Sequence, residues 1–345
     1  MTIKKRPFGQ TKNGKTVELY TLGDNGMYAD IITYGAAIRS INVPAGGGIR
    51  DVALGFDDVA GYEKSTAYHG AIIGRVANRV ANARYEMNGK TYSLDLNNVG
   101  YCLHGGYTGF DKQVWTAGED HGALVLRLLD KEGTAAGFPG DLEAEVRYTL
   151  ENGALGIEYT AKSTEDTPLN LTNHCYFNLG GHGSGSIEGH KIQIFSQSIT
   201  PVDETVIPTG ELMDVSGTVF DLRELTPIAP GLSEECPQIV LGGGYDHNWV
   251  LSTEPHRAPA PAAVVEYDGL RMTCLTTKPG VQFYSGNMMT DETGKGGVKY
   301  RKRSGLCLET QYWPNSVNIP QFPAPLLRKG DVYNHKTIYK FMAVN

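Results

Sequence analysis

Hydrophobic and polar residues alternate along several short segments of the chain, and turn-forming dipeptides separate these segments. In the clearest case every second residue from Leu142 to Leu150 is apolar and the residues between them are polar, a period of two that predicts a half-buried β-strand. Asn152-Gly153 follows, and residues 154–161 resume a strand-like pattern. Because a type I′ turn needs two residues that tolerate positive φ, this segment predicts an antiparallel hairpin.

The same turn chemistry recurs elsewhere in the chain. Asn13-Gly14, Asn88-Gly89 and Asp268-Gly269 each adjoin strand-like segments. Further strands are predicted over residues 28–34, 37–43, 124–129, 172–177, 191–195, 281–284, 306–309 and 337–341. Only short helices fit the pattern, over residues 59–63 and 232–236. Because long amphipathic helices are missing from the pattern, parallel crossovers are disfavoured, and the sequence predicts an all-β fold, a large antiparallel β-sandwich with only short helices.

The length of 345 residues bears on the number of domains. At roughly 150 residues per domain it would suggest two, yet large β-sandwiches exceed 200 residues as one unit. The pattern contains no internal repeat, and the one linker-like stretch, the proline-rich residues 254–262, lies between predicted strands. We therefore expect a single domain over residues 1–345.

Composition and charge exclude several classes of function. No apolar run approaches the roughly 18 residues of a membrane span, and no apolar run follows the basic N-terminal residues, so we expect no membrane association, no secretory signal and a cytoplasmic location. A net charge of -7, with no basic run longer than three residues, argues against nucleic acid as a partner. Five scattered cysteines without a Cys-x-x-Cys pair favour buried, reduced thiols.

No motif for a cofactor or a metal stands out. The glycine runs at residues 46–48 and 242–244 lack the patterns of nucleotide-binding loops, and no predicted helix follows them. The nine histidines are dispersed along the sequence and do not form a His-Glu-x-x-His motif. The sequence therefore predicts an activity that needs neither a cofactor nor a metal.

Two strand-like segments carry groups that can move protons. Alternation puts His174 on the same face as Thr172, Tyr176 and Asn178, a polar face that can line a cleft. Glu309 ends an apolar strand, where burial would raise its pKa toward values that suit a general base. On these residues alone, a core histidine satisfied by hydrogen bonds and a carboxylate in a structural ion pair remain alternatives.

Other segments supply groups suited to a neutral sugar, whose hydroxyls need hydrogen-bond donors and acceptors. These groups are Arg75, Asn78, Arg79, His104, Asp246 and Gln282. Trp249, Tyr312 and Trp313 add aromatic rings on which a pyranose face can stack. Asp246 follows a glycine-rich stretch, so a turn-forming aspartate is the alternative to a ligand-binding one.

Taken together, these segments resemble the aldose 1-epimerase family, also called galactose mutarotases, and the match runs in order over nearly the whole chain. The segments that carry it are residues 55–62, 74–79, 103–106, 109–112, 170–178, 201–204, 245–248, 279–284 and 308–314. The resemblance implies a galactose mutarotase-like supersandwich with an open sugar cleft and no cofactor. It also implies interconversion of the α and β anomers of free aldohexoses such as D-galactose and D-glucose, by a monomer or weak dimer.

The resemblance assigns roles to individual residues. By motif matching, Glu309 is the general base and His174 the general acid. His104 assists catalysis at the ring oxygen, and the residues that bind the sugar are Asn78, Arg79, His104, Asp246 and Gln282. The chemistry fits, since opening a hemiacetal requires one group to take the proton of the C1 hydroxyl and another to protonate the ring oxygen.

Three other functions remain open on the sequence. A glycoside hydrolase would use Asp246 and Glu309 as two carboxylates about 5 to 9.5 Å apart. A sugar-binding or sensing module would bind galactose without converting its anomers. A relative that acts on hexose 6-phosphates would add a cationic pocket for the phosphate. The sequence leaves open whether Arg75 reaches the substrate and whether galactose or glucose is preferred.

Overall fold

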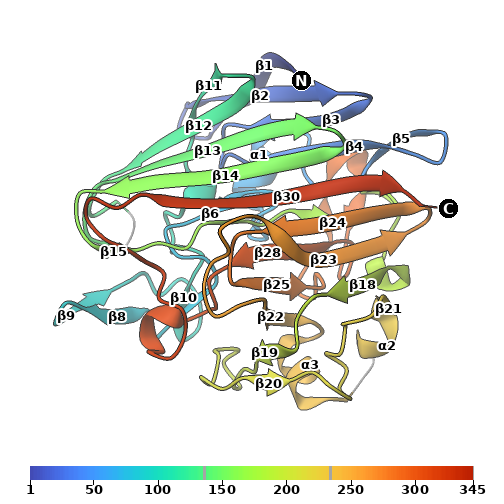
Figure 1. Cartoon of the computed structure of the whole chain (residues 1–345). Coiled ribbons are helices and arrows are strands. Elements are labelled where there is room, and N and C mark those ends of the chain that lie inside the picture. Colours follow the sequence, from blue (N-terminus) through green and yellow to red (C-terminus); the bar gives the residue numbers. More distant parts are fainter. Residues whose placement is uncertain (135–136, 233–234, 345) are drawn as a thin grey trace.

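The computed structural model describes residues 1–134, 137–232 and 235–344, and strands dominate it (Figure 1). The largest sheet is antiparallel and has nine strands, and it is seen face-on in Figure 1. In spatial order its strands are β11 (Thr116–Asp120), β12 (Ala123–Asp130), β13 (Leu142–Glu151), β14 (Ala154–Ser163), β30 (Tyr333–Ala343), β24 (Leu270–Thr276), β23 (Ala260–Tyr267), β18 (Lys191–Ile194) and β21 (Thr226–Pro227).

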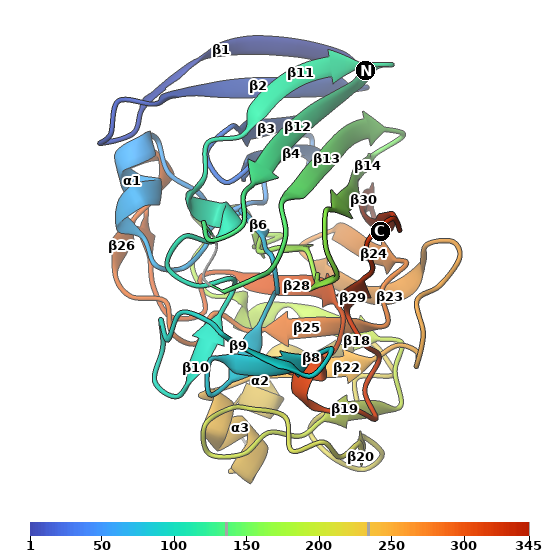
Figure 2. The same cartoon turned by 90° about the vertical axis from the view of Figure 1, so that its left-hand side faces the viewer.

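Two further antiparallel sheets pack against it. The six-stranded sheet contains β17 (Tyr176–Phe177), β28 (Leu306–Gln311), β25 (Gly280–Tyr284), β22 (Asp246–Val250), β19 (Ser198–Thr200) and β20 (Met213–Asp214). The five-stranded sheet contains β1 (Thr2–Gln10), β2 (Thr16–Asp24), β3 (Met27–Ile32), β4 (Ile38–Ala45) and β5 (Gly48–Asp51). Figure 2, turned by 90°, shows β28, β25 and β22 below the five-stranded sheet.

Short elements complete the described part of the chain. The two-stranded pairs are β6 (Ile72–Ile73) with β16 (Thr172–Asn173), β7 (Arg79–Ala81) with β10 (Tyr101–Leu103), β8 (Arg84–Met87) with β9 (Lys90–Ser93), β15 (Thr167–Pro168) with β29 (Leu326–Leu327), and β26 (Glu292–Thr293) with β27 (Lys299–Tyr300). The helices are α1 (Val59–Lys64), α2 (Ile228–Leu232) and α3 (Pro237–Gly242), and single 3₁₀ turns occur at Phe110–Lys112, Ile187–Gly189, Lys295–Gly297 and Ser316–Asn318.

One large apolar core holds the sheets together. Leu142, Val146 and Leu150 of β13 are fully buried, and they pack in the same cluster as residues of β28 and of the five-stranded sheet. Polar contacts also cross the sandwich between β30 and β28: the Tyr339 hydroxyl donates to the Leu308 carbonyl at 2.8 Å. The alternation in the sequence is therefore the pattern that buries one face of each sheet.

The predicted all-β fold is confirmed, as are the hairpins at Asn88-Gly89, Asn152-Gly153 and Asp268-Gly269. Asn13-Gly14 also lies in a hairpin turn, whose first strand, β1, the sequence did not reveal. The predicted helix over residues 59–63 is α1. The predicted helix over 232–236 includes residues 233 and 234, which lie outside the described residues. Among the helices of the described residues, none has the length and apolar character to cross a membrane.

The single strand predicted over residues 172–177 is wrong. Residues 172–173 form β16 and pair with β6, whereas residues 176–177 form β17 and pair with β28. Between them, the His174 N–H donates to the Ala71 carbonyl and the His174 carbonyl accepts from the Gly70 N–H, each at 2.9 Å. The chain passes from one sheet to another at this point, and His174 lies at the crossing.

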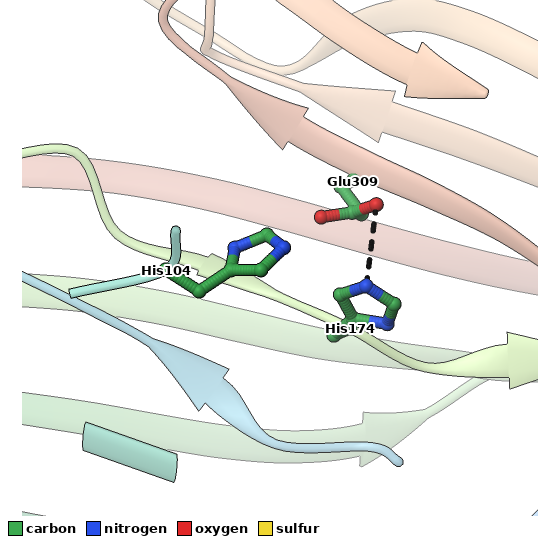
Figure 3. A group of neighbouring side chains, drawn as sticks. All are labelled: His104, His174 and Glu309. Carbon is green, nitrogen blue, oxygen red and sulfur yellow. Dashed lines mark ion pairs between the residues drawn. The ribbon is translucent and has the colours of Figure 1, made fainter. Parts of the chain in front are cut away.

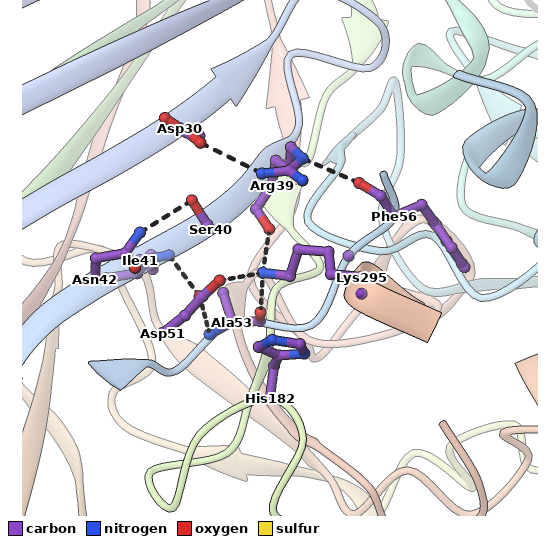
Figure 4. Close-up of polar contacts among 12 residues, drawn as sticks. Asp30, Arg39, Ser40, Ile41, Asn42, Asp51, Ala53, Phe56, His182 and Lys295 are labelled. Carbon is purple, nitrogen blue, oxygen red and sulfur yellow. Dashed lines mark hydrogen bonds and ion pairs between the residues drawn. The ribbon is translucent and has the colours of Figure 1, made fainter. Parts of the chain in front are cut away.

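A polar cluster joins the segment that carries β26 and β27 to the five-stranded sheet (Figure 4). The ammonium of the buried Lys295 donates to the carbonyls of Arg39 at 2.9 Å and Ala53 at 2.7 Å, and it pairs with the carboxylate of Asp51. Since a buried ammonium needs such partners, these bonds hold Lys295, and with it the turn between β26 and β27, against the end of the sheet. Met288 and Met289 of this segment line the pocket described next.

Candidate active site

A pocket of about 370 Å³ opens beside the face of the six-stranded sheet that points away from the core. Its walls include residues of β17, β22, β25, β28 and α3 together with loops that follow α1 and β10. Side chains of β28 alternate between the core and the pocket: Leu306 and Leu308 pack in the main core, and Glu309 faces the pocket. The register continues across the sheet, with Gln282 of β25 opposite Glu309 and Asn248 of β22 opposite Gln282.

Three groups that can exchange protons converge in this pocket (Figure 3). They are Glu309 on β28, His174 at the crossing before β17, and His104 in the loop after β10. The His174 Nε2 lies 3.6 Å from the Glu309 Oε1, and the two side chains are only 5% and 3% exposed. One ligating atom from each of the three residues lies within 4.8 Å of the other two. Histidines dispersed in the sequence are therefore gathered in space, contrary to what their spacing indicated.

Local backbone geometry fixes the His104 ring. His104 has a positive φ of 52° and is followed by Gly105, where an added Cβ would approach the Gly74 carbonyl oxygen to 1.9 Å. The tight turn presents the imidazole Nδ1 to the Asn78 backbone N–H at 3.1 Å. Because Nδ1 accepts this bond, the neutral ring carries its proton on Nε2.

This tautomer decides whether the cluster suits a metal ion. A histidine that binds a metal offers a bare nitrogen and donates its other N–H to a carbonyl or a carboxylate. His104 has the opposite arrangement, since its Nδ1 faces an N–H donor and its Nε2 carries the proton. His104, His174 and Glu309 are spaced like metal ligands, but the geometry at His104 is that of a hydrogen-bond donor.

Burial shapes the electrostatics of the acid-base groups. Loss of solvent raises the pKa of Glu309 well above its usual value, the Asp246 carboxylate adds to this effect, and the Arg79 guanidinium opposes it. Glu309 Oε2 is buried and has no hydrogen-bond partner among the described residues. Burial lowers the pKa of His174 to about 3, and it also lowers that of His104 well below the usual range. Uncharged side chains are thus favoured here when no ligand is bound.

Asp246 is not a simple turn residue. It begins β22, and its carboxylate accepts from the Arg79 Nη2 at 2.9 Å and from the Gln282 Nε2 at 2.7 Å. Asn78 closes the network, since its Oδ1 accepts from the Arg79 backbone N–H at 2.9 Å. Asn78, Arg79 and Asp246 line the pocket, whereas Gln282 lies behind Asp246 and does not.

Arg75 points away from the pocket. Its guanidinium is fully buried and donates to the Asp130 carboxylate at 2.6 Å, to the carbonyl of Pro139 at 2.8 Å and to the carbonyl of Gly140 at 2.8 Å. With its donors engaged in the interior, Arg75 is a structural residue, and the question that the sequence left open is answered.

The expectation that Trp249, Tyr312 and Trp313 stack on a sugar is wrong. Trp249 lies in the main core, Trp313 packs against Phe322, and Tyr312 approaches His335, so none of the three expected rings lines the pocket. The aromatic side chains that do line it are Tyr68, Tyr101, Tyr176 and Tyr284. Side chains alternate between the two faces of a strand, and this alternation separates the two sets of rings. On β22, Trp249 is an odd number of residues from Asp246 and faces the core. On β25, Tyr284 is two residues from Gln282 and lies on the same face as Gln282.

Comparisons with known proteins agree on one family. The family model described as Aldose 1-epimerase matches residues 18–340. The galactose mutarotase of Mus musculus is 42% identical over 344 residues, which cover 99% of each chain. The aldose 1-epimerase of Escherichia coli (strain K12) is 37% identical over 337 residues, which cover 96% of this chain and 97% of the relative. A crystal structure of an aldose epimerase homologue from C. elegans superposes with a TM-score of 0.87 at 29% identity, covering 95% of this chain and 99% of that one.

Proposed function

Since the chain belongs to the aldose 1-epimerase family and is therefore a sugar epimerase, we propose that it interconverts the α and β anomers of free aldohexoses such as D-galactose and D-glucose. The observation that carries the proposal is the pair formed by His174 and Glu309. Two buried proton-transfer groups 3.6 Å apart face one sugar-sized pocket. The pocket lining includes the polar side chains of Asn78, Arg79 and Asp246, as a ligand rich in hydroxyl groups requires.

The reaction needs two coupled proton transfers. Glu309 accepts the proton of the C1 hydroxyl while His174 donates a proton to the ring oxygen, so the bond from C1 to the ring oxygen breaks and C1 becomes an aldehyde. Rotation about the C1–C2 bond presents the other face of the carbonyl. The same transfers in reverse close the ring as the other anomer, and both groups return to their starting states.

The protonation states are consistent with this cycle. A protonated Glu309 beside a neutral His174 contains as many protons as a Glu309 carboxylate beside a His174 imidazolium. Burial favours the first form, and a bound sugar favours the second, because it offers a hydroxyl donor to the carboxylate and a ring-oxygen acceptor to the imidazolium. The reactive form therefore arises by transfer within the pair, without a proton from solvent.

The remaining polar residues position the sugar in this proposal. Asp246, held by Arg79 and Gln282, accepts from a ring hydroxyl, and Asn78 and Arg79 supply donors at the same wall. His104 donates from Nε2 toward the ring oxygen, which stabilises the charge that forms there as the ring opens. A glycoside hydrolase is less well supported, since the ion pair with Arg79 favours the charged form of Asp246 and opposes its use as a proton-transfer group.

Polarimetry tests the proposal. Freshly dissolved α-D-galactose should lose its excess rotation faster with the protein than without it, and the rate should be unchanged by EDTA. Methyl α-D-galactoside is the control, because it lacks a free hemiacetal and should give no change. Release of galactose from the glycoside would indicate a hydrolase, and saturable galactose binding without any acceleration would indicate a binding module.

A further inference from the structure

Cys307 lies next to the acid-base pair but has no role in the chemistry described so far. It precedes Glu309 by two residues on β28, so both side chains leave the same face of the strand. Its Sγ lies 3.5 Å from the Nδ1 of His174, whose other ring nitrogen, Nε2, faces Glu309. The imidazole is thus held between two residues of one strand, with one ring nitrogen directed at each.

We propose that Cys307 is a positioning residue that keeps a proton on the His174 Nδ1, so that Nε2 alone exchanges protons with Glu309 and the sugar. This proposal rests on the proposed function. The sulfur accepts weakly from Nδ1–H in the neutral ring and somewhat more strongly in the imidazolium, whose N–H is the more polar donor. Nε2 is then bare in the neutral ring, and it can take the proton of Glu309 directly.

The opposite tautomer would block this exchange. If the proton of the neutral ring were on Nε2, a further proton could enter only at Nδ1, which faces the thiol and neither Glu309 nor the pocket. The pKa of the Cys307 thiol is raised well above its usual value by burial, so the sulfur stays uncharged. The backbone carbonyl of His174, which only accepts, also favours a proton on the ring, although burial is the larger influence on its pKa.

A weak acceptor is also the right one for a general acid. A carboxylate against Nδ1 would stabilise the imidazolium and make it a poorer proton donor. An uncharged sulfur orients the ring without holding the charge, and the pKa of His174 remains low at about 3. Other groups that titrate or carry charge also act on this ring. They are Glu309, Asp246, His69, His104, Tyr68, Tyr176 and Tyr284.

Nitrogen NMR of the histidine rings in the wild-type protein tests the tautomer directly. The His174 signals, assigned by their loss in His174→Asn, should show a protonated Nδ1 and a bare Nε2. A protonated Nε2 in the neutral ring would overturn the proposal. This measurement does not depend on catalysis, so a protein that fails to convert galactose anomers would refute the proposed function and leave the tautomer to be judged on its own.

Kinetics of two variants test the consequence. Cys307→Ala removes the acceptor, so kcat should fall about tenfold with KM within about twofold, and the basic limb of the pH profile should move to lower pH. Cys307→Ser restores an acceptor and should recover most of kcat. Cys274→Ala, at a cysteine buried in the core on β24, controls for a cavity alone and should keep the wild-type pH profile. A Cys307→Ala enzyme with wild-type kcat and pH profile would overturn the proposal.

Discussion

Replacing Glu309 by glutamine separates the two roles proposed for this side chain, hydrogen bonding to the sugar and proton transfer. Glutamine keeps the shape of the side chain and its capacity for hydrogen bonds, but it cannot take a proton from the C1 hydroxyl. We therefore expect galactose to bind to Glu309→Gln with little change while kcat falls. A general base contributes about 10²- to 10⁴-fold, which corresponds to about 3 to 5.5 kcal/mol of barrier.

For Glu309→Gln we expect a fall in kcat in the upper part of that range. Asp246 is the other carboxylate that lines the pocket, and both of its oxygens already accept hydrogen bonds, from Arg79 and Gln282. Taking a proton would remove the charge through which Asp246 pairs with Arg79, so Asp246 is a poor replacement for the base. A fall in kcat of at least about 10³-fold is therefore expected. Adding His174→Asn should cost less than the sum of the two single losses of activation free energy, because both residues act in one ring-opening event.

Polarimetry of α-D-galactose gives kcat and KM, and thermal unfolding across pH shows whether the variant is folded. The pKa of Glu309 is raised in the folded protein, so its contribution to stability is complete below the unfolded pKa of about 4.3 and declines as the pH rises toward the folded pKa. Glu309→Gln lacks this decline, so its stability relative to wild type should increase from pH 4 to pH 7. A folded variant with kcat within a few-fold of wild type would refute the assignment of the base.

Three further predictions follow from the same geometry. Asp246→Asn should raise KM for galactose. It also removes a charge that raises the pKa of Glu309, so the acidic limb of the kcat/KM profile should move to lower pH. An unchanged KM with a lowered melting temperature would instead mark Asp246 as structural. Arg75→Met should lower the free energy of unfolding, measured in urea, by about 3 to 5 kcal/mol, because it leaves Asp130 buried without its partner. KM of the folded enzyme should stay constant, and a raised KM would show that Arg75 supports binding. The Michaelis constant for galactose should stay nearly constant as salt shortens the Debye length from about 30 to 3 Å, and a strong dependence would point to a phosphorylated sugar.

Local chemistry in the sequence predicts much of this fold and less of the site. Dipeptides such as Asn152-Gly153 specify a turn by themselves, so hairpins are visible without tertiary information. The break at His174 is not visible, because it depends on hydrogen bonds to residues 70 and 71, a hundred positions earlier. The place of Trp249 is also hidden from the sequence, because the pattern predicts no strand over residues 246–250, and only the alternation along β22 puts that ring in the core.

The pairing of β28 with its neighbours has a consequence for folding and engineering. Because side chains alternate, a slip of one residue in register would turn Glu309 into the apolar core and Leu308 into the pocket. Catalytic activity in a refolding sample thus reports on correct pairing in the centre of the molecule. Libraries aimed at new sugars are best built by exchanging side chains on the pocket face of this strand, because an insertion or deletion within it would cost stability and activity together.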